Sequence, residues 1–283
     1  MSDSLSPATP DTALAHVIAP ASWRCVDFVS DLHLQQDDAT WQAFARYLQQ
    51  TPADAVFLLG DIFEVWVGDD VTGSAEHGFE RAVAAALRTA GATRALYFMH
   101  GNRDFLVGQT FCAEAGMTLL QDPCVLEWPQ AAGASERILL SHGDALCIDD
   151  TQYMQFRAQV RQPAWQQALL QQALEQRLAL ARQLRAQSES RKNELGVEGY
   201  ADVDHPLACR WLAEHGCHTL LHGHTHKPAE HVLDASHQPP LRRLVLGDWE
   251  MGGHPVRGDV LRWCPGKDQP WDRVPAVSYA TGD

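Results

Sequence analysis

The sequence has no long apolar run, because its richest stretch, residues 55–68, is interrupted by Asp61 and Glu64. A transmembrane helix needs ~20 consecutive apolar residues, so we expect no membrane span. Basic residues are absent before Arg24, so the positively charged start of a signal peptide is also missing. These absences predict an intracellular protein.

Cysteine pairs at metal-binding or redox spacing are missing too. The seven cysteines are odd in number and no C-x-x-C occurs, which fits neither a disulfide framework nor a zinc–thiolate site. Free cysteine is among the most buried residue types. We therefore expect reduced, mostly buried thiols at Cys25, Cys112, Cys124, Cys147, Cys209, Cys217 and Cys264.

Basic charge is scarce, since 22 Lys and Arg face 36 Asp and Glu and give a net charge of −14. Proteins that coat nucleic acid usually carry a basic face, so we expect no nucleic-acid partner. The G-x-x-x-x-G-K-[ST] loop and the G-x-S-x-G elbow are absent. Their absence excludes a P-loop enzyme and disfavours a triad of Ser141, His142 and Asp144. Nothing in the sequence indicates an obligate protein partner.

Residues 23–265 show a regular alternation of β-branched or aromatic runs with Ala-rich stretches. This alternation predicts an α/β sandwich built on layered sheets. Residues 1–22 and 266–283 are predicted to be flexible tails. The expected strands are 25–30, 55–59, 95–99, 138–141, 219–221 and 244–246, and the expected helices include 41–50, 80–90 and 207–215.

A segment at about 151–200 departs from this alternation. It has no strand signal, and its residues 151–192 carry a net charge of +5. Pro163 could open a helix. The segment is either a solvated helix with a core-facing stripe or a helical cap over a site for an anionic, partly apolar ligand. The stripe consists of Leu170, Leu174, Leu178 and Ala181.

Five predicted strands run directly into residues that can bind metal ions. Ligand sites in α/β sheets gather beyond the carboxyl ends of the strands. We therefore expect the five groups to converge on one rim. They are Ser30-Asp31-Leu32-His33, Gly60-Asp61, Gly101-Asn102-Arg103-Asp104, His142-Gly143-Asp144 and His222-Gly223-His224-Thr225-His226.

The candidate ligands are two carboxylates, one amide oxygen and four imidazoles. This set suits Mn²⁺, Fe²⁺ or Zn²⁺. It is too large for one ion, but a carboxylate shared by two ions ~3.5–4 Å apart would use all of it. Two such cations would leave a site attractive to phosphate. The candidates are Asp31, His33, Asp61, Asn102, His142, His224 and His226, with Asp104 expected to orient His142.

In the order of these motifs, residues 24–265 resemble the calcineurin-like metallophosphoesterases. The resemblance implies a four-layered αββα sandwich with two metal ions and a metal-activated water as nucleophile. It assigns Asp31, His33 and His226 to the first metal, and Asn102, His142 and His224 to the second. Asp61 would bridge the two metals.

Arg103 stands where that family usually places a histidine that can protonate a leaving alkoxide. Arginine stays charged at pH 7 and is no practical general acid, but it can clamp phosphate oxygens. The leaving group should therefore need no proton. A phosphate expelled from a pyrophosphate bond qualifies, since its second pKa is near 6.

The chain also resembles a narrower family, the UDP-2,3-diacylglucosamine diphosphatases. The resemblance lies in residues 64–70 and 141–150, in Gly101-Asn102-Arg103-Asp104-Phe105 and in the helical insertion. That resemblance implies Mn²⁺-dependent cleavage of UDP-2,3-diacylglucosamine to UMP and 2,3-diacylglucosamine 1-phosphate in lipid A biosynthesis. It implies two Mn²⁺ per chain and a peripheral position on the anionic cytoplasmic face of the inner membrane. The implied substrate contacts are Asn102, Arg103, Asp150, Ser188, Lys192, Asn193 and His224.

Two alternatives remain open. One is a soluble nucleotide pyrophosphatase or phosphodiesterase of the same superfamily, and the other is a non-catalytic binding module on this fold. A full set of seven ligands disfavours the binding module, because a scaffold does not need them.

Overall fold

The computed structural model describes residues 13–36, 38–74, 76–130, 133, 135–195 and 201–280, without the side chains of 187–195. Eleven strands in these residues form one hydrogen-bonded sheet in the order β11-β10-β2-β3-β4-β5-β6-β7-β9-β8, and β1 pairs with β5. The strands are β1 Leu14–Ile18, β2 Val26–Val29, β3 Ala55–Leu59, β4 Ala95–Met99, β5 Thr118–Pro129, β6 Ser135–Ser141, β7 Thr219–His222, β8 Ala229–Asp234, β9 Leu241–Val245, β10 Asp259–Trp263 and β11 Trp271–Pro275.

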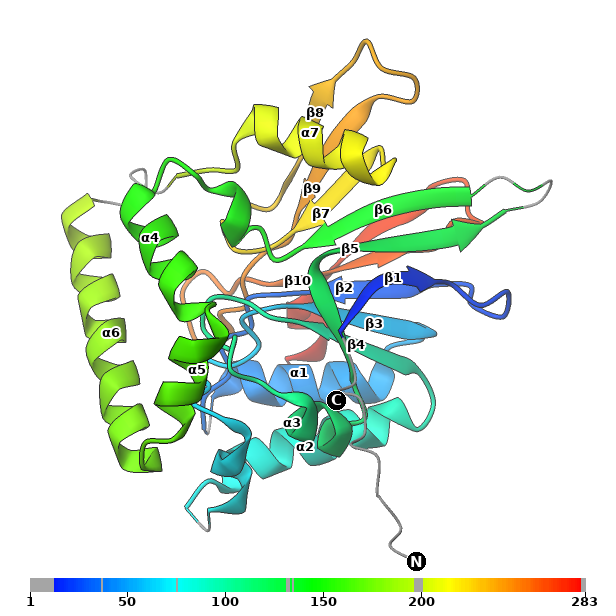
Figure 1. Cartoon of the computed structure of the whole chain (residues 1–283). Coiled ribbons are helices and arrows are strands. Elements are labelled where there is room, and N and C mark those ends of the chain that lie inside the picture. Colours follow the sequence, from blue (N-terminus) through cyan, green and yellow to red (C-terminus); the bar gives the residue numbers. More distant parts are fainter. Residues whose placement is uncertain are drawn as a thin grey trace, which may run out of the picture.

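The helices lie on both faces of the sheet and at one end of it (Figure 1). In that view α1, α2 and α3 lie below the strands and α7 lies above them, while α4, α5 and α6 stand together at the left. The helices are α1 Ala39–Gln50, α2 Gly78–Gly91, α3 Gln109–Ala115, α4 Thr151–Val160, α5 Pro163–Leu170, α6 Leu174–Leu195 and α7 His205–His215.

The buried side chains separate into three clusters because successive strand residues face opposite sides. Val56 and Leu58 of β3 pack with α1 and α2, whereas Phe57 between them packs in a second cluster with Leu140 of β6. Leu139 of β6 points the other way and packs with α7. Three apolar interfaces separate four layers, so the predicted αββα sandwich is confirmed.

The long strand β5 joins the two halves of this sandwich. Its first residues, Thr118 to Leu120, pair in parallel with β4, and Cys124 to Pro129 pair antiparallel with β6. The two sheets of the sandwich are therefore one continuous ladder folded about β5.

The expected strands and helices are confirmed with small shifts at their ends, but the expected tails are wrong in part. Leu14–Ile18 form β1, and the C-terminal segment adds β11 after residue 270. Backbone pairing explains both errors, because β1 adds to β5 and β11 adds to β10 as five-residue strands whose side chains are mostly exposed or half-buried. Residues 1–12 and 281–283 lie outside the described part.

Cys25 and Cys264 form a disulfide, so the expectation that all seven cysteines are reduced is wrong for this pair. Val26 of β2 pairs with Trp263 of β10, and this register places the flanking cysteines next to each other across 239 residues of sequence. The other five cysteines are free and lie buried or half-buried, as expected. No helix in the described residues is both long and apolar enough for a membrane span.

Asp27, in the middle of β2, is the centre of a buried polar cluster. It is fully buried and accepts hydrogen bonds from Arg262 Nε at 2.7 Å, Tyr47 Oη at 3.0 Å and Thr51 Oγ1. These partners belong to β10, α1 and the residue after α1. The carboxylate thus ties the C-terminal strand and the first helix to the strand that carries the first motif.

We expect Asp27→Ala to lower the free energy of unfolding by ~3–5 kcal/mol, because it leaves the Arg262 guanidinium without its buried partner. The control is Glu230→Gln, which breaks an exposed pair with Arg242 at 3.3 Å. That change should cost under ~1 kcal/mol. Denaturant unfolding of both variants measures the difference, and equal small losses would contradict the role given to Asp27.

Candidate metal centre

The loops after β2 and β3 continue the pairing of these strands beyond their ends. The Asp31 N–H donates to Gly60 O at 3.1 Å, and the His33 N–H donates to Asp61 O at 3.0 Å. Each loop thereby holds the other in register. The D-x-H and G-D motifs lie side by side at the carboxyl edge of the sheet.

Gly60 brings the third and fourth motifs against the second. Its φ is +87°, and a Cβ there would lie 2.6 Å from both the Gly101 Cα and the His142 Nδ1. No side chain fits such an approach, so this glycine is required by both conformation and space.

One group of ligand atoms gathers around Asp31. His226 Nε2 lies 3.2 Å and His33 Nε2 lies 4.0 Å from Asp31 Oδ1, and the two Nε2 atoms are 3.4 Å apart. These donor atoms lie close enough to one another to hold one metal ion.

A second group gathers around Asn102. Its Oδ1 lies 3.0 Å from His142 Nε2 and 2.9 Å from His224 Nδ1. His142 Nε2 is also 3.8 Å from Asp61 Oδ1, and Asp31, Asp61 and His142 could together hold an ion. All seven candidate ligands therefore meet at one rim, with Asp31 common to both groups. The bridging role of Asp61 stays a prediction.

The backbone at this rim is unusual. Among the described residues, the non-glycine positions with positive φ are all candidate ligands: Asp31, His33, Asp61, His224 and His226, with φ between 47° and 66°. Holding a non-glycine residue in the left-handed backbone conformation costs ~1–3 kcal/mol of folding free energy. Such strain persists only where the surrounding structure enforces it, and here it points the ligand side chains inward.

Burial and mutual proximity shift the pKa values of these groups. Burial raises the pKa of Asp61, while the neighbouring histidines outweigh burial and lower the pKa of Asp31. Burial lowers the pKa of His224 to about 3. Burial also opposes the charge of His142, but Asp61, Asp31 and Asp144 raise its pKa to about 9. A cation at this rim would compensate the buried carboxylates directly.

The donors fit a divalent metal ion in chemistry and in orientation. His142 Nδ1 donates to Leu59 O at 2.9 Å, which points Nε2 at the rim, where it can bind a metal ion that displaces its proton. His226 Nδ1 lies 3.6 Å from Asp248 Oδ2, so a carboxylate supports this ring as well. Imidazole and carboxylate donors without a thiolate suit a borderline cation such as Mn²⁺, Fe²⁺ or Zn²⁺.

Residues 26–228 match the family model of the calcineurin-like phosphoesterases. The chain belongs to this family. It is 47% identical over 228 residues to the UDP-2,3-diacylglucosamine hydrolase of Chromohalobacter salexigens, covering 79% of this chain and 88% of that protein. It is also 46% identical to the protein of the same name from Chromobacterium violaceum, covering 80% of this chain and 91% of that protein. The predicted family is confirmed, and the chain is a hydrolase that binds divalent metal.

Arg103 of this phosphoesterase lies beside the metal rim. Its backbone N–H donates to Asp61 Oδ1 at 2.8 Å, and its Nε lies 3.7 Å from Asp61 Oδ2. Its guanidinium is bound by Glu64, and Arg185 of α6 binds the same carboxylate. Glu64 therefore joins the insertion formed by α4, α5 and α6, called the cap from here on, to the arginine of the third motif. The sequence motif at 64–70 contains Glu64 but does not predict this contact.

The role expected for Asp104 is wrong. Its carboxylate accepts hydrogen bonds from the backbone N–H groups of Ile62 at 2.7 Å and Gly101 at 2.8 Å, not from His142. A backbone carbonyl orients the histidine instead. Burial raises the pKa of Asp104 to about 7, and its two bonds hold the second and third motif loops together.

The cap is held on the domain by its basic residues. Arg157 and Tyr153 of α4 both bind the buried Asp144, and the Arg157 Nε distance is 2.8 Å. Arg161 Nη2 donates to Gly101 O at 2.9 Å. Together with Arg177 and Arg185, most of the described arginines of the insertion therefore face the domain and not solvent.

The prediction that Leu170, Leu174, Leu178 and Ala181 form one apolar stripe along a single helix is wrong. Leu170 ends α5 and is 42% exposed, whereas Leu174 begins α6, so one helical face does not carry both. The most buried described side chain of α6 is Arg177, whose Nη1 donates to Val67 O at 2.6 Å. It also binds the exposed carboxylate of Asp70, so the buried Arg177 side chain ties α6 to the loop after β3.

The predicted substrate contacts are described only in part. Asn102, Arg103 and His224 lie at the rim, and Asp150 caps α4, accepting from the Tyr153 N–H at 3.0 Å. The side chains of Ser188, Lys192 and Asn193 lie outside the described part of α6.

We expect divalent cations to stabilise the metal-stripped protein, because bound ions relieve the buried carboxylates. At a concentration 100 times the dissociation constant, the gain is ~2.7 kcal/mol. Thermal unfolding in EDTA and after adding Mn²⁺ or Zn²⁺ measures it. Asp31→Ala should lose most of this gain, and a control at exposed Asp272 should keep it. An equal gain in both variants would place the metal elsewhere.

Proposed function

We propose that the protein hydrolyses the pyrophosphate bond of UDP-2,3-diacylglucosamine to UMP and 2,3-diacylglucosamine 1-phosphate, with two Mn²⁺ as cofactors. The observation that carries this proposal is the position of Arg103 beside the rim that holds both groups of candidate ligands. A phosphodiesterase that acts on alkyl esters needs a proton donor at this position. The printed names of the relatives support the same substrate.

Divalent ions bound at this rim would supply a water of lowered pKa as nucleophile and positive charge for the phosphate oxygens. The residues that would hold them are Asp31, His33, Asp61, Asn102, His142, His224 and His226. The tautomer of His142, fixed by Leu59 O, keeps its Nε2 available for this purpose.

Arg103 binds the phosphate that bears the departing charge. Its planar guanidinium can donate two parallel hydrogen bonds, and a leaving phosphate needs no added proton. Glu64 holds this guanidinium at the rim, so little rotamer freedom is lost when substrate binds.

The cap covers the acylated sugar. Its first helix, α4, is capped by Asp150 and carries Tyr153, whose ring lies 5.9 Å from the ring of His224. Acyl chains then extend along the apolar side chains that the cap and its neighbours expose, since each buried CH₂ contributes ~0.8 kcal/mol.

We place the protein at the cytoplasmic face of the inner membrane as a peripheral protein. The inward arginines contribute little to binding an anionic surface. Exposed Val65, Ile148 and Leu170 lie in segments that form or flank the cap and offer apolar contacts instead. Disulfides are rare in the cytosol, so alkylation of the Cys25–Cys264 pair in fresh lysate tests this location separately.

We expect Asp61→Ala to lower turnover of the diacylated UDP-sugar at saturating Mn²⁺ by ~10²–10³-fold, the scale of losing a major electrostatic group. Metal analysis should show less than the wild-type content. Wild-type turnover by this variant would contradict the two-metal proposal. Exposed Asp272→Ala on β11 is the control.

We expect Arg103→Lys to keep the charge but to lower kcat/KM by about 10- to 100-fold, because hydrogen bonds to charged groups contribute ~1.5–3 kcal/mol. Arg103→His should not restore pyrophosphate cleavage but should raise activity on alkyl phosphodiesters. Exposed Arg88→Lys serves as the control. If Arg103→Ala cleaves the UDP-lipid like the wild type, the leaving-group proposal fails.

We expect the protein to sediment with anionic phosphatidylglycerol vesicles and to be only partly released as salt rises, because apolar contacts resist screening. Leu170→Asp should weaken this binding without changing metal content. A protein that ignores vesicles but cleaves soluble UDP-sugars equally well would favour the soluble nucleotide pyrophosphatase.

A further inference from the structure

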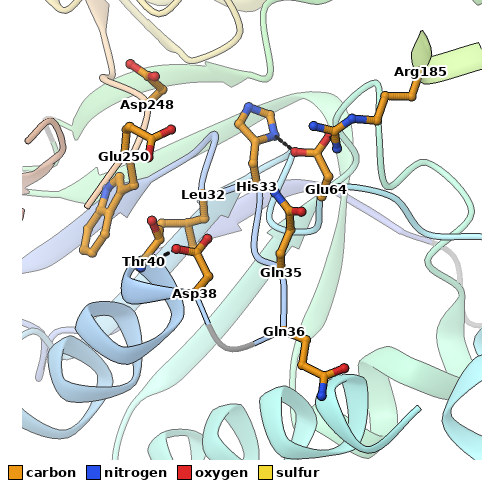
Figure 2. A pocket seen from close by; sticks show the side chains of 11 residues that line it. Leu32, His33, Gln35, Gln36, Asp38, Thr40, Glu64, Arg185, Asp248 and Glu250 are labelled. Carbon is orange, nitrogen blue, oxygen red and sulfur yellow. Dashed lines mark hydrogen bonds and ion pairs between the residues drawn. The ribbon is translucent and has the colours of Figure 1, made fainter. Parts of the chain in front are cut away.

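A cavity of ≈ 340 Å³ adjoins the metal rim, and no function has yet been given to it. It lies between the loop after β2 and the loop after β9, with His33, Gln35 and Glu64 on one side and Asp248 and Glu250 across from them (Figure 2). His33 is a candidate metal ligand, so the cavity opens directly beside the metal rim.

The lining of the cavity is polar. Leu32 and Trp249 are its apolar members and both are buried, at 1% and 3% exposure. The Trp249 Nε1 donates to Asp259 O at 3.0 Å, and the ring packs edge-on against Phe44. Trp249 is therefore part of the core and no stacking platform. A polar lining of this kind gives acyl chains little apolar surface to bury.

Most of the carboxylates at the cavity already have partners. Asp38 accepts from the Thr40 N–H at 2.9 Å as the N-cap of α1, and Asp248 accepts from Arg257. Glu64 is bound by two arginines. What the cavity offers to a ligand is the exposed amide of Gln35 and the exposed carboxylate of Glu250.

We propose that this cavity binds the nucleoside half of the substrate. The proposal rests on the function proposed above, in which the two ends of the substrate extend in different directions from the scissile phosphate. The cap takes the acylated sugar, so the nucleoside needs a separate, polar place next to the rim. A glutamine amide offers a donor and an acceptor to the edge of a base, and a carboxylate accepts from ribose hydroxyls.

The test uses the Mn²⁺-loaded full chain with UMP as a product inhibitor. We expect Gln35→Ala and Glu250→Gln each to raise the inhibition constant of UMP about tenfold, equal to ~1.4 kcal/mol. The ratio of kcat/KM for the UDP-lipid to that for bis-p-nitrophenyl phosphate, which has no nucleoside, should fall by a similar factor. Gln171→Ala, an exposed glutamine at the end of α5, is the matched control and should change neither value.

Two results would overturn the inference. One is UMP inhibition of both cavity variants equal to that of the wild type. The other is a parallel loss on both substrates, which would show a general effect on the rim. The proposed function is judged separately, by the wild-type enzyme. If the wild type cleaves the UDP-lipid, the proposed function holds even when the cavity inference fails. If the wild type does not cleave it, the proposed function is refuted.

Discussion

Two carboxylates, Asp31 and Asp61, are buried side by side at the edge of the sheet, and the rest of the site is arranged around this costly placement. An isolated buried carboxylate shifts its pKa or needs a partner charge. Here the partners are histidines from distant motifs, held by loops that hydrogen-bond to one another. The same negative charge, which is unfavourable without a cation, makes the rim suited to divalent ions.

The sequence predicts the alternating strands and helices well because most of those strands are buried on both faces and carry continuous apolar runs, as in β3. It misses β5, β8 and β10 as well as β1 and β11. Strands β1, β8 and β11 lie at the ends of the strand order or off it and have mostly exposed or half-buried side chains, so pairing with neighbours holds them and no apolar run marks them. The site ligands are predictable because each follows a strand in the parallel part of the sheet. The groups that orient these ligands are not predictable from the sequence. His142, for example, is oriented by the backbone carbonyl of Leu59, and no side-chain pattern encodes that contact.

The cap shows why charge counts over a segment are a weak guide to partners. A local excess of arginine indicates an anionic surface only if the side chains reach solvent. Arg157 and Arg177 instead bind Asp144 and Asp70, so the positive charge of the insertion is balanced by the negative charge of the domain. Part of the acidic charge of the domain and part of the basic charge of the insertion are therefore paired with each other inside the protein.

The pairing of β2 with β10 has a consequence for synthesis on the ribosome. β2 carries the first motif, but its neighbour on one side, and the Arg262 that neutralises Asp27, emerge more than 230 residues later. At ~5–20 residues per second this edge stays unpaired for about 10–50 seconds. Nascent chains of this phosphoesterase therefore carry an open strand edge, which could pair with another chain, until β10 has left the ribosome.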